Sequence, residues 1–483
     1  MRGVVVIGGG FSGVAVGVNL AAASPEPLAI TVVEPAESVG RGVAYGTDDP
    51  DHRLNGPSVI HFLQLADTSQ FTRWHAECGA LERDPESIHG DVVFARRHDF
   101  GTYLNEQFKA AAASNPSGSV ITHRRDRVVD LDVSARGVRV KLHQHDPIDA
   151  DLAVLTTSNA PPAVPPALRP LNGASGFIGN PWEPAALAAV PPVGRVLIVG
   201  TGLTMADIAV TIRRDRPDVA VSALSRRGLM PRSLPAEFGG PGGDIIDTLT
   251  TRSPAFLDRH PDATTVRDLL RSVRADIAAA VADGGSWHGG FDAVRDAAHV
   301  VWPNLAPGEQ ARFVRHLAPW YEVHRFRYPP QTERVIAAAL ADGSLTVEAS
   351  RLTAARVRDD GFEIVRRRRN DGVEVAETFD VVVNCTGPER KPRASGDPLL
   401  ANLVARGVVT PDRNGLGLSI DDLSSAVDAS GESNPRLRVV GPLARGRFGE
   451  CAGVPHIVAR MSDALPSMLD TIRDAECSNL VSD

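Results

Sequence analysis

The sequence contains few cysteines, and none of them form a close pair. Cys78, Cys385, Cys451 and Cys477 are far apart and make no CxxC motif. This spacing argues against a disulfide reductase, which depends on a close redox-active pair. The cysteine spacing also matches no pattern typical of a zinc site, and we expect no metal. Cysteines distributed in this way are compatible with a reducing compartment, so we expect a cytoplasmic protein.

Lysine and long apolar runs are also scarce. Lysine occurs only at positions 109, 141 and 391, and arginine supplies nearly all the positive charge. The net charge of −8 argues against a nucleic-acid partner. No run reaches ~18 uninterrupted apolar residues, so no membrane span is expected. The apolar start, Gly3 to Ala23, is interpreted as the first strand and helix of a folded domain and not as a signal peptide.

Length and composition indicate an ordinary globular chain. With 483 residues, 43% hydrophobic and 23% charged, the chain can form two or three domains with a sizeable core. No heptad repeat or apolar stripe indicates an oligomeric state, which stays unknown at this point.

Two glycine-rich turns stand out. The first is VVVIGGGFSG, Val4 to Gly13, and the second is VLIVGTGLTMAD, Val196 to Asp207. Each turn lies between a β-branched strand and a helical run, the context in which such a pattern binds a dinucleotide. Glycine lets the backbone approach a pyrophosphate, which then lies at a helix N-terminus. The sequence therefore predicts two dinucleotide-binding units.

The residues that follow each turn indicate different cofactors. Glu34 ends the strand after the first turn, where its carboxylate can accept hydrogen bonds from ribose hydroxyls, as FAD requires. Arg226 and Arg227 end the strand after the second turn and suit a ribose 2′-phosphate; solvated charge is the alternative. We therefore expect FAD in the first unit and NADPH in the second. Met205 replaces the expected third glycine or alanine and is expected to loosen the packing of helix on strand.

A second feature occurs in both halves of the chain. Alternating apolar and polar residues surround a turn at Ala135-Arg136-Gly137 and again at Asp359-Asp360-Gly361, and each segment ends in a buried strand. The closing strands lead to Ser158 and Gly387. This build resembles flavoproteins in which an NADP domain is inserted into an FAD domain. In those proteins the closing strand leads to Thr-Gly, and Ser158 departs from that pattern.

The region between the two parts of the second unit has a helical pattern. FGGPGGD, Phe238 to Asp244, is predicted to be a flexible joint. One amphipathic helix is expected over Val266 to Val281 and another around Phe313, Leu317 and Trp320. Such an insertion is either a helical cap with its own core or a lid over the flavin, and we favour the lid.

The segment Trp320 to Pro330 contains His324, Arg325 and Arg327 beside aromatic residues. Three such groups cannot all be buried without partners. They suit an anionic or carbonyl-rich substrate or the NADPH phosphates. Ion pairing between the insertion and the rest of the protein is an equal alternative.

Together these patterns predict an α/β fold with two Rossmann-like dinucleotide-binding domains and a helical insertion. The expected ranges are 1–185 and 385–483 for the FAD domain, 186–237 and 328–384 for the NADP domain, and 238–327 for the insertion.

Several further segments resemble one family. They are Gly40 to Val59, Arg96 to Leu104, Gly179 to Trp182, Leu224 to Pro231, Trp320 to Pro330 and the second glycine-rich turn. Over nearly the whole chain the sequence resembles bacterial FAD/NAD(P)-binding proteins related to FAD-dependent urate hydroxylases and to amino-acid N-oxygenases that make nitrosuccinate. More distantly it resembles class B flavin monooxygenases.

The resemblance implies which residues contact each cofactor. FAD would be bound by Gly8, Gly10, Phe11, Ser12, Gly13, Glu34, Gly42, Val43, Ala44, Gly441 and Val454. NADPH would be bound by Gly200, Gly202, Leu203, Thr204, Ser225, Arg226 and Arg227. The side chains expected near the flavin ring, as candidate catalytic residues, are Tyr45, Asn55, His324 and Arg325. Packing is the alternative for Tyr45, and turn hydrogen bonding is the alternative for Asn55.

The expected function is that of an NADPH-dependent flavin monooxygenase. It would use dioxygen to oxygenate a small polar, nitrogen-containing substrate through a C4a-(hydro)peroxyflavin, with the flavin supplying the difficult chemistry. One alternative is an NAD(P)H oxidase or flavin-dependent dehydrogenase that inserts no oxygen. A second alternative, motivated by Met205 and Ser158, is a non-catalytic flavin-binding redox sensor or scaffold. His52 and the pair His98-Asp99 are further candidates for titrating groups, although loop histidines are more often solvated, which is the expectation favoured for them.

Overall fold

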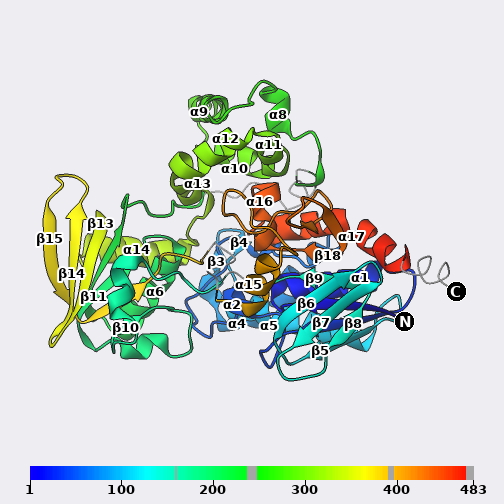
Figure 1. Ribbon diagram of the computed structural model, residues 1–483. Coiled ribbons are helices and arrows are strands. Elements are labelled where there is room, and N and C mark those ends of the chain that lie inside the picture. Colours follow the sequence, from blue (N-terminus) through cyan, green and yellow to red (C-terminus); the bar gives the residue numbers. More distant parts are fainter. Residues whose placement is uncertain (158–159, 236–246, 248, 390–395, 475–483) are drawn as a thin grey trace.

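A computed structural model describes residues 1–157, 160–235, 247, 249–389 and 396–474. The predicted joint at Phe238 to Asp244 and Ser158 lie outside these residues. The described chain forms two units, each built around a sheet, and a group of helices that lies beside both of them (Figure 1). The α/β fold with two Rossmann-like units, predicted above, is thus confirmed.

The first unit is built on a six-stranded sheet. Its strand order is β17-β18-β9-β1-β2-β5, and all neighbours are parallel except β17 and β18. The strands are β1 Arg2–Ile7, β2 Leu28–Val33, β5 Val120–Arg124, β9 Leu152–Leu155, β17 Ser425–Val427 and β18 Ser433–Val439. All four residues of β9 are buried, as a central parallel strand requires when both sheet faces are covered.

Helices α1 Phe11–Ala23, α5 Arg97–Ala113 and α17 Val454–Asp474 pack against this sheet. A further long helix of the unit is α15 Pro398–Ala405. The shorter ones are α2 Gly42–Tyr45, α3 Gln70–Glu77, α4 Ala80–Arg83 and α16 Arg445–Phe448. Helix α1 packs against both α5 and α17, so residues from the two ends of the chain share one core. A small hairpin, β3 Ile88–His89 and β4 Val92–Val93, also belongs to this part of the chain.

The second unit is built on a seven-stranded sheet with the order β10-β16-β11-β12-β13-β14-β15. Its strands are β10 Phe177–Ile178, β11 Val193–Val199, β12 Asp218–Ser225, β13 Leu345–Arg358, β14 Gly361–Arg368, β15 Glu374–Phe379 and β16 Val381–Asn384. Its helices are α6 Leu203–Asp215 and α14 Pro330–Ala341. Strand β10 lies in this sheet, although residues 177–178 fall in the range expected for the FAD domain.

The two alternating segments described above each form a three-stranded antiparallel meander. Strands β6 Val128–Ser134, β7 Gly137–Leu142 and β8 Ile148–Ala150 form a separate antiparallel sheet. Strands β13, β14 and β15 form the second meander, which continues the sheet of the second unit. Gly137 pairs with Ser134 and Gly361 with Arg358, so each hairpin has the short turn expected from its glycine.

The helical insertion comprises residues 255–325 and lies apart from both sheets (green in Figure 1). It consists of α8 Ala255–Arg259, α9 Val266–Ala282, α10 His288–Asp296, α11 Ala298–Asn304, α12 Pro307–Arg312, a π-helical turn Phe313–Leu317 and α13 Ala318–Arg325. Both predicted helices are present. Trp320 is nevertheless 44% exposed, so its side chain does not join Phe313 and Leu317 in the small core of the insertion.

The other described elements are short helical turns at Ser58–Ile60, Pro85–Ser87, Pro166–Leu171, Ala186–Ala189 and Pro442–Ala444. None of the helices within the described ranges is long and apolar enough to cross a membrane.

Candidate functional site: a cavity between two dinucleotide-binding units

The first glycine-rich turn connects β1 to α1. Gly8 has a φ of +105°, a conformation that favours glycine, and a Cβ atom there would lie 2.9 Å from the Thr156 carbonyl oxygen. A Cβ atom at Gly13 would overlap the Gly8 carbonyl oxygen. The chain therefore needs both glycines to bring α1, β1 and the end of β9 close together.

Glu34 follows β2 directly and faces the same turn. One carboxylate oxygen accepts a hydrogen bond from the Gly9 amide at 2.8 Å, and the other accepts one from the Ala36 amide at 3.0 Å. Each carboxylate oxygen retains a lone pair for a further donor. Glu34 is thus held at the edge of the turn, where a ribose hydroxyl would be recognised.

A cavity of about 1310 Å³ begins at this turn. The residues predicted for FAD that line it are Gly8, Gly10, Phe11, Ser12, Glu34, Gly42, Val43 and Ala44. The atom nearest to a Cβ placed on Gly10 is the Gly42 Cα at 3.8 Å, so the turn leaves space in front of it. Val43 is 51% exposed although it is apolar, as expected for a residue that a cofactor covers. These residues fit FAD.

The C-terminal part of the chain closes one side of the cavity. Pro442, Ala452 and Ile457 line it, and they neighbour the predicted contacts Gly441 and Val454. Gly441 has a φ of +106°, and a Cβ atom there would lie 2.6 Å from the Ser12 hydroxyl oxygen. The close approach of these two segments explains why a glycine stands at position 441.

The second glycine-rich turn connects β11 to α6. Gly200 has a φ of +121°, and a Cβ atom there would overlap the Cys385 carbonyl oxygen. Gly202 has open space around it, and Leu203 begins α6. The Ser225 hydroxyl accepts hydrogen bonds from the Thr201 hydroxyl at 2.8 Å and from the Gly228 amide at 3.0 Å. Ser225 therefore joins this turn to the loop after β12.

The two arginines of that loop have different surroundings. Arg226 is exposed and Arg227 is half-buried. Within the described part of the chain, neither guanidinium forms an ion pair with an acidic side chain. Both charges are therefore available to a ligand as well as to solvent.

Met205 does not loosen the second unit. Its side chain is completely buried and belongs to the core formed by β11, β12, β16 and α6. The expectation of looser packing was wrong, because the methionine side chain itself fills the space between helix and sheet. At the equivalent position of the first unit, Gly13, no side chain fits.

Of the four candidate catalytic side chains, only Tyr45 lines the cavity. Tyr45 lines the cavity and packs edge-on against Phe100 at 4.8 Å, and burial raises the pKa of its hydroxyl to about 12, although the Arg97 charge opposes the shift. Asn55 lies outside the lining and accepts a hydrogen bond from Arg97 at 3.1 Å.

His324 and Arg325 also lie outside the lining of the cavity. The His324 ring stacks on Phe291 at 4.3 Å, and its Nδ1 lies 2.7 Å from the Trp320 carbonyl oxygen. Arg325 pairs with the buried Glu450 at 3.2 Å. Arg327, which follows the insertion, pairs with Asp292 of α10 at 2.9 Å. The ion pairing left open above is therefore what the structure shows, and a catalytic role for Asn55, His324 or Arg325 stays a prediction.

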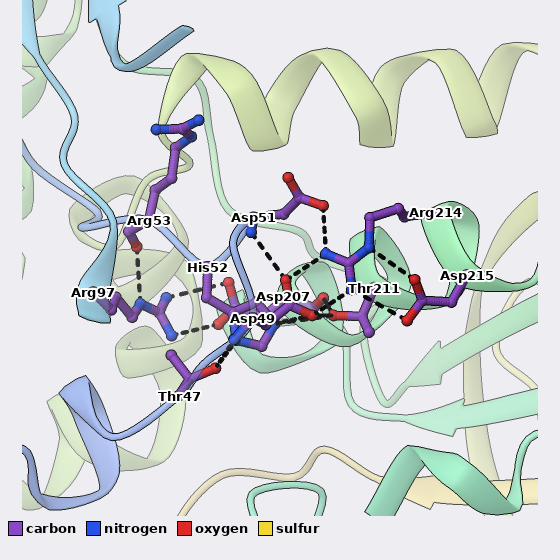
Figure 2. Close-up of polar contacts among 10 residues, drawn as sticks. All are labelled: Thr47, Asp49, Asp51, His52, Arg53, Arg97, Asp207, Thr211, Arg214 and Asp215. Atoms are coloured by element: carbon purple, nitrogen blue, oxygen red, sulfur yellow. Dashed lines mark hydrogen bonds and ion pairs between the residues drawn. The ribbon is translucent and has the colours of Figure 1, made fainter. Parts of the chain in front are cut away.

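Sequence reasoning did not find a polar cluster that joins the two units (Figure 2). His52 is only 4% exposed, so the expectation of a solvated loop histidine was wrong. The sequence did contain a pattern that indicates this cluster. Asp207, Thr211 and Arg214 are spaced so that they lie on one face of helix α6.

The cavity also extends to the second unit. Thr204, Ile208, Thr211 and Ile212, one face of α6, line it together with Trp182. The first turn of one dinucleotide-binding unit and the helix of the other thus border one continuous space.

Comparisons with known proteins agree with this geometry. Residues 5–160 match the family model described as FAD-NAD(P)-binding. No curated protein matches the sequence. Among solved structures, an ornithine hydroxylase from Pseudomonas aeruginosa is 14% identical, with a TM-score of 0.63 over 98% of this chain and 99% of that chain.

Two further structures are similar. An ornithine N-hydroxylase from Kutzneria sp. 744 is 16% identical, with a TM-score of 0.63 over 99% of this chain and 100% of that chain. An L-lysine 6-monooxygenase from Pseudomonas syringae is 17% identical, with a TM-score of 0.61 over 98% of this chain and 100% of that chain. Residues 5–160 thus form an FAD/NAD(P)-binding domain, in a chain that has the overall fold of these hydroxylases and monooxygenases.

Proposed function

We propose that this protein is an FAD-dependent, NADPH-using monooxygenase that oxygenates a small polar substrate containing nitrogen. The observation that carries the proposal is the single cavity bordered by both dinucleotide-binding units, from Gly8 and Gly10 on one side to Thr204 on the other. Two cofactors that exchange a hydride must meet, and this cavity gives them a common space.

Individual residues have distinct tasks in this proposal. Gly8, Gly10, Ser12 and Glu34 hold FAD at the first turn. Gly200 and Gly202 allow the pyrophosphate of NADPH to approach the second turn, while Arg226 and Arg227 bind its 2′-phosphate. When bound, FAD supplies the redox and oxygen chemistry.

The surrounding side chains exclude water from the reaction. Tyr45, Ile208 and Trp182 cover the cavity with apolar surface, which limits unproductive release of hydrogen peroxide. A substrate that contains nitrogen is supported by the similar structures, which are an ornithine hydroxylase and an L-lysine 6-monooxygenase. We expect the enzyme to be cytoplasmic, because its cysteines do not require an oxidising compartment.

The proposal is tested by NADPH oxidation in the presence of candidate amino acids, amines and purines, with peroxide measured in parallel. Substrate-stimulated oxidation without matching peroxide, and labelled dioxygen found in the product, are the expected results. If peroxide accounts for all the NADPH consumed, the protein is an oxidase or dehydrogenase. Protein that is colourless, or yellow but not bleached by NADPH under argon, would instead be a non-catalytic flavin-binding protein.

A further inference from the structure

The polar cluster between the two units is defined here as the interdomain clamp, with residues Asp49, His52, Arg97, Asp207, Thr211 and Arg214 (Figure 2). The first three belong to the first unit, and the other three belong to one face of α6 in the second unit. The two groups are far apart in sequence, and Arg97 and Asp207 are separated by 110 residues.

The centre of the clamp is a buried ion pair. Arg97 contacts the two carboxylate oxygens of Asp207 at 2.8 Å and 3.2 Å, and their side chains are only 11% and 6% exposed. The same guanidinium donates to the Arg53 carbonyl oxygen at 2.8 Å and to Asn55 at 3.1 Å. The first unit therefore orients the guanidinium, and the second unit supplies its counter-charge.

A chain of hydrogen bonds lies beside this pair. His52 contacts the Thr47 hydroxyl through Nδ1 at 2.8 Å and the Thr211 hydroxyl through Nε2 at 3.1 Å. The Thr211 hydroxyl donates to Asp49 at 2.6 Å. Since the Thr211 hydroxyl donates its one proton to Asp49, it accepts a hydrogen bond from Nε2 of His52. One threonine hydroxyl of the second unit thus joins an imidazole and a carboxylate of the first unit.

Charge at the solvent side completes the clamp. Arg214 contacts Asp49 at 2.6 Å and 3.0 Å, and it also reaches Asp51 at 2.7 Å. The ring of Trp182 packs edge-on to His52 at 5.8 Å, and both residues line the cavity. The contacts therefore run without interruption from the cavity to the surface.

The clamp attaches to both cofactor-binding segments. Asp49 and His52 follow directly after the segment Gly42–Tyr45, which lines the cavity. Asp207 lies in the first turns of α6, directly behind the second glycine-rich turn. A displacement of α6 against residues 47–53 would therefore change the distance between the two turns.

We propose that the interdomain clamp fixes the second unit in the position needed for hydride transfer, and that Arg97 and Asp207 are positioning residues for this step. The inference rests on the proposed function, because it assigns NADPH to the second unit. Misplacement of two reacting groups by a small distance costs rate even where both remain bound.

The test compares two buried ion pairs of similar geometry. Asp207→Asn breaks the pair between the units. Asp84→Asn breaks the pair between Arg53 and Asp84, which has distances of 2.6 Å and 2.9 Å, exposures of 5% and 6%, and lies wholly within the first unit. It also removes the 3.2 Å contact of Asp84 with Arg96, another residue of the first unit. Both variants lose stability, since each leaves a buried guanidinium without its counter-charge.

Only Asp207→Asn is expected to slow the anaerobic bleaching of FAD by NADPH, by tenfold or more at saturating NADPH, with FAD content and reduction by dithionite unchanged. The double variant Arg97→Gln with Asp207→Asn removes both charges. It is expected to recover thermal stability but not the rate, which separates positioning from folding. Equal slowing by Asp84→Asn, or full recovery of the rate in the double variant, would overturn the inference.

Hydrogen–deuterium exchange supplies a readout that needs no NADPH. Asp207→Asn is expected to increase exchange in residues 47–53 and 203–215, whereas Asp84→Asn leaves residues 203–215 protected. Unchanged exchange in residues 203–215 of Asp207→Asn would show that the clamp does not hold α6. If the wild-type flavin is not reduced by NADPH, the proposed function fails, and the exchange data alone decide whether the clamp exists.

Discussion

The backbone of Gly200 lies so close to Cys385 that a Cβ atom at position 200 would overlap the Cys385 carbonyl oxygen. Thus the second glycine-rich turn and the end of β16 approach each other as closely as the chain allows. The first unit repeats this relationship between Gly8 and Thr156. In both units the glycine is required by the protein itself before any ligand binds.

Gly200→Ala is therefore expected to destabilise the protein as a folded chain. The added methyl group meets the Cys385 carbonyl, and the φ of +121° is also unfavourable for alanine. Gly202→Ala is the matched control, since no atom lies within 4 Å of its added Cβ. Thermal unfolding without NADPH should show a lower Tm only for Gly200→Ala. An equal Tm for both variants would contradict the steric explanation.

Replacing Met205 by alanine, a residue that matches the usual dinucleotide-binding pattern, is expected to weaken the second unit. Removal of the buried methionine side chain would leave a cavity, and such truncations cost about 2–5 kcal/mol. Urea unfolding measures this loss. A Met205→Ala variant as stable as wild type would show that α6 moves inward to close the space.

The converse change in the first unit, Gly13→Ala, should prevent FAD retention, because its methyl group would overlap the Gly8 carbonyl oxygen.

Arg226→Ala is expected to raise the NADPH concentration needed for half-maximal reduction about tenfold, since one charge-assisted hydrogen bond contributes about 1.5 kcal/mol. The NADH requirement should change little, because NADH carries no 2′-phosphate. Steady-state reduction with both cofactors measures the difference, and Arg136→Ala in the β6–β7 turn serves as a charge control. Equal losses with NADPH and NADH would remove the phosphate-binding role from Arg226.

Glu450 is expected to make stability depend on pH under acidic conditions. Burial raises the pKa of its carboxyl, but the charges of Arg325, His456 and Arg445 together lower this pKa to about 2. In the unfolded chain a glutamate carboxyl has a pKa of about 4.3. Ionised Glu450 therefore stabilises the fold above that pH, and the contribution is lost as the pH falls toward about 2.

Tm measured from pH 6 to pH 2.5 should accordingly fall less steeply in Glu450→Gln than in wild type. At pH 7 the variant should be less stable, because the buried Arg325 loses its ion-pair partner. Parallel curves for the two proteins would show that Glu450 does not titrate differently in the folded and unfolded states.

The thiols of Cys385 and Cys451 are expected to resist modification in the native protein. Burial raises the pKa of both thiols, that of Cys451 to about 12, so little reactive thiolate forms near neutral pH. Titration with a thiol reagent before and after addition of denaturant measures this protection. Among the three cysteines that the structure describes, the half-buried Cys78 is expected to react first. Rapid modification of Cys385 or Cys451 without denaturant would show that the fold opens locally.

Local patterns in the sequence predicted most of the secondary structure. The helix expected over Val266 to Val281 and the turns before Gly137 and Gly361 are present, because each depends on residues close in the chain. The same holds for the two strand–turn–helix motifs. The roles of Arg325 and Met205 could not be read in this way, since ion pairing with Glu450 and burial against another strand depend on distant residues.

The sequence alone determined that the chain has two dinucleotide-binding turns, because glycine spacing and the flanking apolar strands act within short segments. Only the tertiary structure decided that the first turn and helix α6 border one cavity and that Arg97 meets Asp207. These contacts join residues whose proximity arises when α6 packs against the first unit, and no local pattern encodes the partner that a buried charge will find.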